Sequence, residues 1–150
     1  MRIILQRVSE ASVRIDDRVC GCIRCGFVIL LGIVDGDGQD DIDWLAGKIA
    51  RMRVFADDEG KMNLSLKEVA GELLVVSQFT LHASTRKGNR PSFIKAARPE
   101  TAIPLYQQFL ATLEKEIGQP CAAGEFGADM KVAMVNDGPV TIMVDSQLRE

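Results

Sequence analysis

LLVVSQFTLHASTRKGNRP, residues 73–91, joins an apolar run directly to a polar loop. Its first four residues, Leu73 to Val76, are apolar without a break, which is typical of a strand covered on both faces. From Ser77 to Arg90 the chain carries hydroxyls, an amide, an imidazole and cations. Loops that leave a rigid buried strand are common places for binding and catalysis. The stretch therefore predicts a buried strand with a candidate site at its carboxyl end, and an ordinary strand followed by a solvated loop is the alternative.

Patterns on either side of this stretch predict further strands and two helices. A second unbroken apolar run, GFVILLGIV, covers residues 26–34. Apolar residues recur at helical spacing in residues 39–53 and 99–117, and Pro104 lies near the start of the second segment, where a missing N–H is tolerated. Shorter strands are expected at residues 2–8, 11–15, 18–23, 54–55, 62–66, 121–126, 130–135 and 140–144. Many antiparallel strands with two amphipathic helices predict an α+β fold whose sheet is mostly antiparallel and curled or barrel-like.

Length and composition are those of an ordinary globular protein. The 150 residues are 47% hydrophobic and 26% charged, which fits one domain, residues 1–150, with a sizeable core. The apolar run between Arg2 and Arg7 is too short for a signal peptide, and no later run approaches a membrane span. We therefore expect a cytoplasmic protein without a membrane partner. Its cysteines are then expected to stay reduced: Cys20, Cys22, Cys25 and Cys121.

Charge is unevenly distributed along the chain. The formal net charge of −3 argues against a general nucleic-acid binder, which neutralises many phosphates. Residues 73–99 nevertheless contain no Asp or Glu and hold the cations Arg86, Lys87, Arg90, Lys95 and Arg98. This positive patch suits an anionic ligand with a small footprint, such as one end of an RNA. A charged loop that only keeps the protein soluble is the alternative.

The Asn-Asp-Gly-Pro segment at residues 136–139 permits two interpretations. All four residues form turns readily, so the residues alone favour a tight hairpin turn between neighbouring strands. A Gly-Pro bond also adopts the cis form more easily than other bonds, and glycine allows close backbone approach. The pair can therefore present fixed carbonyl oxygens to a ligand instead.

Motifs for metals and for side-chain nucleophiles are weak. The cysteine spacing C-x-C-x2-C has no second cysteine or histidine pair, so no metal site is expected. The Asp-Gly alternation at residues 35–38 lacks the ligand series of a calcium loop. His82, the only histidine, lies two residues after Thr80 and is a candidate general base, although a lone histidine in a polar loop is more often a surface or hydrogen-bonding group.

Four separated segments resemble the D-aminoacyl-tRNA deacylase family in its bacterial type: SQFTL at 77–81, RKGNRPSF at 86–93, FGADM at 126–130 and NDGPVT at 136–141. The likeness continues through the opening MRIILQRVSEASV and GKMNLSL at 60–66, so it spans essentially the whole chain. The resemblance implies a homodimeric hydrolase, with no metal or other cofactor, that cleaves the ester between a D-amino acid and the terminal ribose of tRNA. It also implies activity on glycyl-tRNA, and a role in chiral proofreading during translation.

The resemblance further implies which residues form the site. Ser77, Gln78, Phe79 and Thr80 match the segment that floors the family's pocket and carries catalysis. Gly138 and Pro139 match a cis pair that each subunit lends to the other's site. Arg7 matches the arginine that holds this pair, and Phe126 and Met130 match residues near the pocket. For tRNA binding, the positive patch offers Arg86, Lys87 and Arg90.

The expected mechanism follows from the chemistry of the substrate. An aminoacyl ester is already activated, so an enzyme need only position water and stabilise the developing oxyanion. Main-chain N–H groups around Phe79 and Thr80 are candidates for this task, and the resemblance implies that the ribose hydroxyl of the substrate assists them. A Thr80 nucleophile ranks second, since only His82 is near enough in sequence to activate it. A carbonyl wall from Gly138 and Pro139 would bind the α-amino group and leave no room for an L side chain.

Two other classes of function remain open. One is a non-catalytic RNA-binding module that uses the positive patch, although only Phe93 supplies the patch with an aromatic ring for stacking on bases. The other is a threonine-dependent hydrolase of small esters that does not use tRNA.

Overall fold

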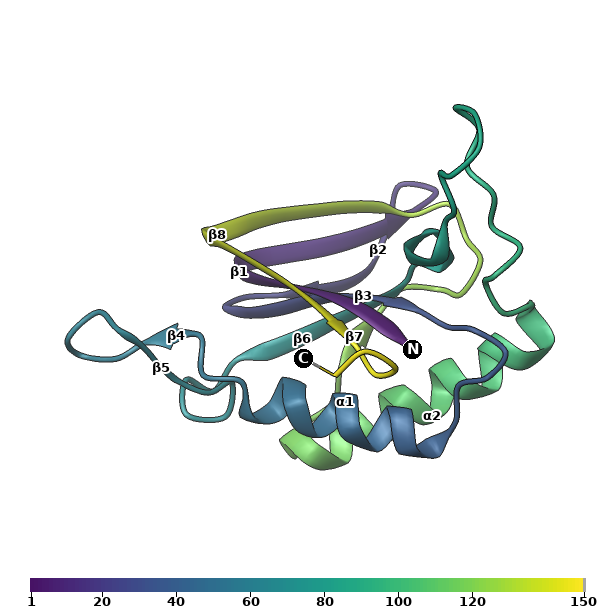
Figure 1. Cartoon of the computed structure of the whole chain (residues 1–150). Helices are drawn as coiled ribbons and strands as arrows, with labels where there is room; N and C mark the ends of the chain where they lie inside the picture. Colours follow the sequence, from purple (N-terminus) through teal and green to yellow (C-terminus); the bar gives the residue numbers. More distant parts are fainter. Residues whose placement is uncertain (150) are drawn as a thin grey trace.

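The computed structural model describes residues 1–149 as a strongly bent sheet with two helices packed side by side against one face (Figure 1). In chain order the elements are β1 (Arg2–Ile15), β2 (Arg18–Ile23), β3 (Gly26–Gly32), α1 (Gln39–Arg51), β4 (Phe55–Ala56), β5 (Met62–Leu64), β6 (Glu72–Ser77), the 3-10 helix η1 (Phe79–His82), α2 (Pro99–Ile117), β7 (Ala122–Ala123) and β8 (Lys131–Asp145). Within residues 1–149, neither α-helix is both long and apolar enough to span a bilayer.

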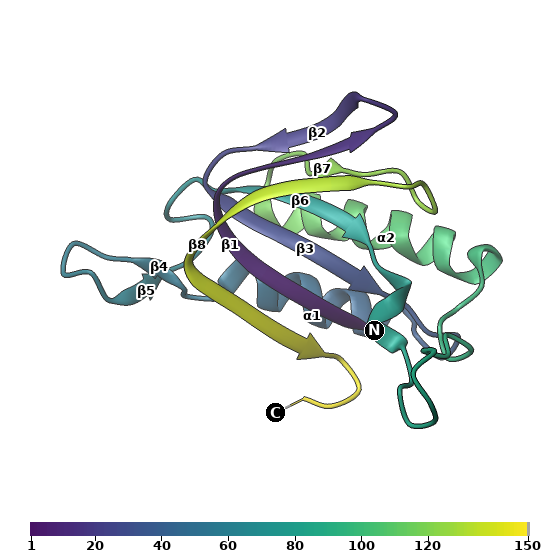
Figure 2. The same ribbon diagram turned by 90° about the horizontal axis from the view of Figure 1, so that it is seen from above.

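The main sheet follows the order β2-β1-β3-β6-β7, and β8 also pairs with β1. Strand β1 runs antiparallel to β2, β3 and β8, whereas β3 and β6, and β6 and β7, run parallel. The amino-terminal half of β1 pairs with β3 and its carboxyl-terminal half with β2, while β8 bends along both halves (Figure 2). The sheet is therefore mixed and nearly closed into a barrel, which confirms the expected α+β fold with two helices and a curled sheet.

Strands β3 and β6 lie at the centre of the sheet and are covered on both faces, as their unbroken apolar runs predict. Phe27 and Ile29 of β3 pack with Leu45 of α1 and Phe109 of α2 in the core between sheet and helices. Val28 of β3 faces the opposite way, into a second core inside the curl of the sheet. Full burial of such a side chain contributes about 1.5–3 kcal/mol to stability, so these strands anchor the fold.

Both predicted helices are confirmed, with one difference at an end. Helix α2 covers Pro99–Ile117 as predicted, and Gly118 closes it in the left-handed conformation at φ 77°. Pro99 occupies the first turn, whereas Pro104, which is expected there, lies inside the helix. Helix α1 begins at Gln39 but ends at Arg51, two residues before the predicted end. Met52 already has extended backbone angles there, because the chain turns toward β4.

The hairpin turn predicted at residues 136–139 is wrong. Residues 131–145 form one strand, and both of its halves pair with β1 in the same direction: Asn136 opposite Val8, and Thr141 opposite Gln6. Residues 137–140 stand opposite the single residue Arg7, so this segment is a wide bulge within β8. In a hairpin the two halves of residues 131–145 would pair with each other, whereas here both halves pair with β1.

Other strand boundaries also differ from the predictions. Residues 2–8 and 11–15 form one bent strand, because β1 exchanges one partner for another near its middle. The strand expected at residues 121–126 shrinks to Ala122–Ala123. The chain after it leaves the sheet as a loop that covers the end of β6, and this loop becomes part of the candidate site.

Candidate functional site

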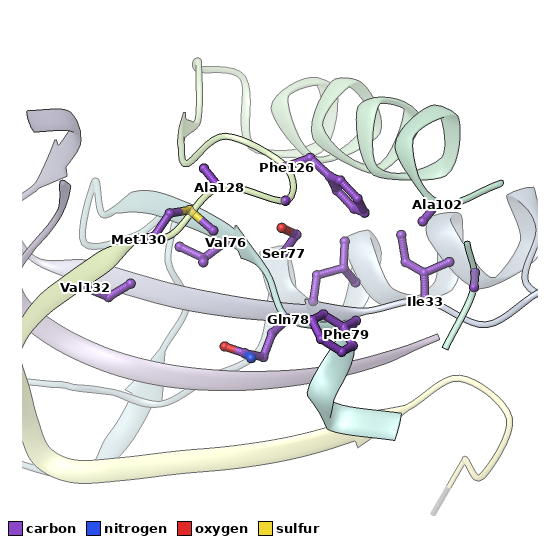
Figure 3. Close-up of a pocket in the computed structure, with 13 residues that line it drawn as sticks. Ile33, Val76, Ser77, Gln78, Phe79, Ala102, Phe126, Ala128, Met130 and Val132 are labelled. Atoms are coloured by element: carbon purple, nitrogen blue, oxygen red, sulfur yellow. The ribbon is translucent and has the colours of Figure 1, made fainter. Parts of the chain in front are cut away.

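A cavity of about 240 Å³ lies where β3 and β6 end, beside the start of α2 (Figure 3). Parallel neighbours bring their carboxyl ends to the same edge of a sheet, so Leu31 of β3 and Val76 of β6 meet there. Ser77, Gln78 and Phe79 continue the lining directly after Val76. The polar segment that follows the buried strand β6 therefore lies at a mostly apolar cavity. The sequence predicts a buried strand with a candidate site at its carboxyl end in this stretch.

The segment after β6 is held in place by main-chain hydrogen bonds. The Gln78 N–H donates to the Leu31 carbonyl at 2.7 Å, which attaches the exit of β6 to β3. The first bond of η1 runs from the Leu81 N–H to the Gln78 carbonyl at 3.2 Å. Within residues 1–149, no hydrogen bond uses the N–H of Phe79 or of Thr80. One of these unbonded donors belongs to Phe79, which lines the cavity, and the other to Thr80, the next residue in the chain.

The Thr80 hydroxyl is already engaged. Gln78 Nε2 donates to Thr80 Oγ1 at 2.5 Å, and Thr80 does not line the cavity. In Figure 3 the Gln78 side chain points away from Phe126, while Phe126 reaches the cavity from the loop before β8. Four residues are expected to carry catalysis. Three of them line the cavity, namely Ser77, Gln78 and Phe79, and Thr80 does not.

His82 is buried rather than on the surface. The residue is 8% exposed, its Cδ2 would lie 3.0 Å from a Cβ at Gly32, and its Nε2 has no hydrogen-bond partner within residues 1–149. Burial lowers the pKa of His82, and the backbone of Gly32 opposes that effect. The ring is therefore neutral at neutral pH, and it lies outside the lining of the cavity.

Phe126 and Met130 form part of the cavity wall. The Phe126 ring lies edge-on to Tyr106 of α2, with centroids 5.8 Å apart, and the Tyr106 hydroxyl donates to the Val75 carbonyl at 3.1 Å. Burial raises the pKa of Tyr106 to about 12, so it remains a neutral donor that supports this wall. Gly124 makes room for Met130, because a Cβ at Gly124 would lie 2.4 Å from Met130 Sδ.

Arg7, Gly138 and Pro139 lie away from this cavity. In register, Arg7 is opposite Phe27 near the start of β3, whereas the cavity is at the end of that strand. The Arg7 Nε donates to the Asp137 carbonyl at 3.0 Å, and a second guanidinium nitrogen donates to the Val54 carbonyl. The Gly138-Pro139 bond is cis, and both residues are exposed. The residues that the sequence assigns to one site are thus in two places on a single chain.

Arg86, Lys87 and Arg90 lie on an exposed loop that projects from the body of the protein (Figure 1). The base of the loop is closed by Ser84 and Ser92, whose main chains exchange hydrogen bonds of 2.8 and 2.9 Å. The loop is therefore a defined arm next to the cavity rather than a loose connection.

Several lining residues are not among those predicted from the sequence: Leu31, Ile33, Val76, Ala97, Ala102, Gly127, Ala128 and Val132. The apolar members belong to runs that the sequence assigns to the core. The alanines line the cavity because their short side chains leave space open. No periodicity or motif marks them, since space is a property of all the surrounding residues together.

Comparison with known proteins gives one consistent family. The family described as D-Tyr-tRNA(Tyr) deacylase matches residues 4–145. Proteins named D-aminoacyl-tRNA deacylase from Flavobacterium johnsoniae and Akkermansia muciniphila are 57% and 58% identical, and each match covers 100% of both chains.

Two solved structures share the fold. One is titled "c-Myc DNA Unwinding Element Binding Protein", with 39% identity, a TM-score of 0.90, and coverage of 97% of this chain and 98% of that chain. The other is described as a probable eukaryotic D-amino acid tRNA deacylase, with 18% identity, a TM-score of 0.81, and coverage of 95% of this chain and 97% of that chain. At that identity the second likeness concerns the fold alone.

Proposed function

The chain belongs to the D-Tyr-tRNA(Tyr) deacylase family, and we propose that it hydrolyses the ester between a D-amino acid and the terminal ribose of tRNA. The products are a free amino acid and a tRNA that can be charged again, so the reaction proofreads chirality in translation and belongs in the cytoplasm. The observation that supports this most directly is the cavity itself, whose mostly apolar lining includes Phe79, a residue whose N–H has no hydrogen-bond partner within residues 1–149.

The chemistry of the ester fits such a cavity. The N–H groups of Phe79 and Thr80 stabilise the oxyanion that forms when water attacks the ester carbonyl. The apolar lining keeps bulk water away, which strengthens these hydrogen bonds. The ribose hydroxyl next to the ester assists in proton transfer, because the residues that line the cavity, all within 1–149, include no carboxylate, imidazole or amine. The Thr80 hydroxyl accepts a hydrogen bond from Gln78, and the neutral His82 lies at Gly32. No base is therefore placed to activate Thr80 within residues 1–149, which disfavours a threonine-dependent esterase.

We further propose that the protein acts as a homodimer in which Gly138 and Pro139 complete the cavity of the partner subunit. On their own chain these residues are exposed and distant from the cavity, and Arg7 holds the preceding carbonyl. Val135 and Met143, on the same strand, are exposed apolar side chains of the kind that subunit interfaces cover.

Stereochemical selection follows from that arrangement. Main-chain carbonyl oxygens of Gly138 and Pro139 accept hydrogen bonds from the substrate's α-ammonium group and form a rigid wall beside it. An L side chain would have to occupy the space of this wall, whereas a D side chain points away from it. Glycine has no side chain to exclude, so glycyl-tRNA is also hydrolysed.

One assay tests the proposed function. Purified protein is incubated with D-aminoacyl-tRNA, L-aminoacyl-tRNA and a simple D-amino-acid ester, and release of the amino acid is followed. We expect hydrolysis of the first substrate only. Equal hydrolysis of the L-form, or of the simple ester, contradicts the proposal.

A cavity variant and its control sharpen the assay. Ala128 lines the cavity, so Ala128→Phe fills it with a ring and abolishes hydrolysis. Ala111 is exposed on α2, so Ala111→Phe adds the same ring at a solvent-facing position and keeps activity. Activity retained by Ala128→Phe would place the reaction elsewhere.

A further inference from the structure

An exposed apolar patch, Phe93 and Ile94, adjoins Phe79 at the cavity, and neither Phe93 nor Ile94 has a role in the reaction as described. Phe79, which lines the cavity, is 54% exposed and meets Phe93 edge-on, with ring centroids 5.2 Å apart. Phe93 is 38% exposed and Ile94 is 90% exposed. Single exposed apolar residues are common, but a contiguous group beside a binding cavity indicates a contact surface.

The patch is rigidly joined to the cavity wall. Phe93 begins a tight turn in which the Ala96 N–H donates to the Phe93 carbonyl at 3.0 Å. The next residue, Ala97, lines the cavity, and its N–H donates to the Ile33 carbonyl at 2.9 Å. Ile94 therefore occupies the outer corner of a fixed turn, a position where polar or turn-forming residues are the usual choice.

Cations flank the patch in the sequence, and they are exposed. Ser92 precedes Phe93 and closes the base of the loop that carries Arg86, Lys87 and Arg90. Lys95 lies in the same turn as Ile94 and is exposed. Since residues 73–99 contain no acid, the apolar surface lies in a wholly positive stretch of the chain. Apolar or aromatic faces bordered by cations suit single-stranded nucleic acid, whose bases stack while its phosphates pair with positive charges.

We propose that Phe93 and Ile94 form a platform on which the unpaired nucleotides preceding the terminal nucleoside of aminoacyl-tRNA stack. The proposal rests on the proposed function, because it requires the aminoacyl end to occupy the cavity. The aminoacyl end occupies the cavity in this proposal, and each preceding nucleotide adds a base, a ribose and a phosphate, so the strand crosses the rim. A strand that leaves past Phe79 reaches Phe93 next and then the cations of the projecting loop.

The experiment compares two substrates that share the reacting end. One is D-aminoacyl-tRNA, and the other is the same amino acid esterified to adenosine alone, which lacks the preceding nucleotides. Ile94→Ser and Phe93→Leu raise KM for the tRNA substrate about tenfold more than KM for the nucleoside ester, because stacking of one base is lost. Phe93→Tyr keeps an aromatic ring, so its KM for the tRNA substrate equals that of the wild type. Met62→Ser, an equally polar change at an exposed residue of β5, is the control and alters neither KM.

Other outcomes decide against the platform. Equal losses on both substrates would assign Phe93 and Ile94 to the pocket for the terminal nucleoside, and no loss on either would leave the patch without this role. If light scattering shows that Ile94→Ser changes the oligomeric state, the patch is a contact between copies of the chain instead.

A binding measurement separates the platform from the proposed function. Fluorescence anisotropy compares uncharged tRNA with tRNA trimmed of its unpaired 3′ nucleotides. The platform requires that wild type binds the intact tRNA more tightly and that Ile94→Ser loses this preference. If that result is found while D-aminoacyl-tRNA is not hydrolysed, the platform stands and the proposed function fails.

Discussion

Substitution of Gly138 by alanine tests the bulge of β8 as part of an active site. The backbone of Gly138 has φ +127°, a value that side chains rarely tolerate. A Cβ there would lie 2.8 Å from a terminal nitrogen of Arg7 and 3.0 Å from Val140 Cγ2. The Arg7 side chain cannot move aside freely, because its guanidinium donates hydrogen bonds to the carbonyls of Asp137 and Val54. The added methyl group must therefore displace either the bulge or Arg7.

The expected effects differ in size between stability and activity. Strained backbone of this kind costs on the order of 1–3 kcal/mol. A cost of about 2 kcal/mol lowers the Tm of a chain of this length by roughly 4–8 °C, so the protein remains folded at assay temperature. A shift of about 1 Å in a positioning group lowers rate by about a hundredfold. We therefore expect Gly138→Ala to lose about a hundredfold in kcat/KM and some discrimination against L-aminoacyl-tRNA.

Two measurements decide the matter: deacylation kinetics with D- and L-aminoacyl-tRNA, and thermal unfolding. Gly36→Ala is the control, because a Cβ there meets nothing within 4 Å and the backbone is unstrained. Wild-type kinetics and D/L preference in Gly138→Ala would refute the assignment of the bulge to any site.

Mixing two inactive variants tests whether the bulge acts on the partner subunit. Gly138→Ala keeps an open cavity, and Ala128→Phe keeps an intact bulge. In a symmetric dimer, a mixed pair has one cavity that faces an intact bulge, so random mixing restores roughly a quarter of wild-type activity. No recovery after subunit exchange would mean that each chain uses its own bulge or none.

Three further changes test the site and its surroundings. Thr80→Ala removes only the hydroxyl that Gln78 contacts, so deacylation should remain substantial in a turnover assay; a loss near the roughly million-fold cost of removing a nucleophile would contradict this. Gly124→Ala pushes Met130 into the cavity, so KM should rise while Tm changes little, because methionine adapts easily. Burial lowers the pKa of His82 from 6.5, so the unfolded chain binds a proton that the folded chain excludes as pH falls below that value. Stability is lost on acidification through this range, and His82→Gln should reduce the fall in Tm; an unchanged pH dependence would show that His82 is not its source.

Local signals in the sequence determined most of the elements. The unbroken apolar runs of β3 and β6 predict strands covered on both faces, and both are buried in the centre of the sheet. The helical spacing of apolar residues over residues 99–117 predicts α2 at its observed bounds. Such signals work because they depend on residues only a few positions apart. The resemblance to a family, rather than any local pattern, brought Phe126 and Met130 together with Ser77 as candidates.

Tertiary structure alone decided where the pieces of the site lie. The Asn-Asp-Gly-Pro segment has the composition of a hairpin turn, yet it forms a bulge because β1, more than a hundred residues earlier in the chain, holds Asn136 and Thr141 on either side. His82 belongs to a polar stretch but is buried, because η1 packs on Gly32. Ala97 lines the cavity only because its neighbours in space leave room. Pairing register, burial and empty volume are set by contacts between distant residues, and no window along the chain contains them.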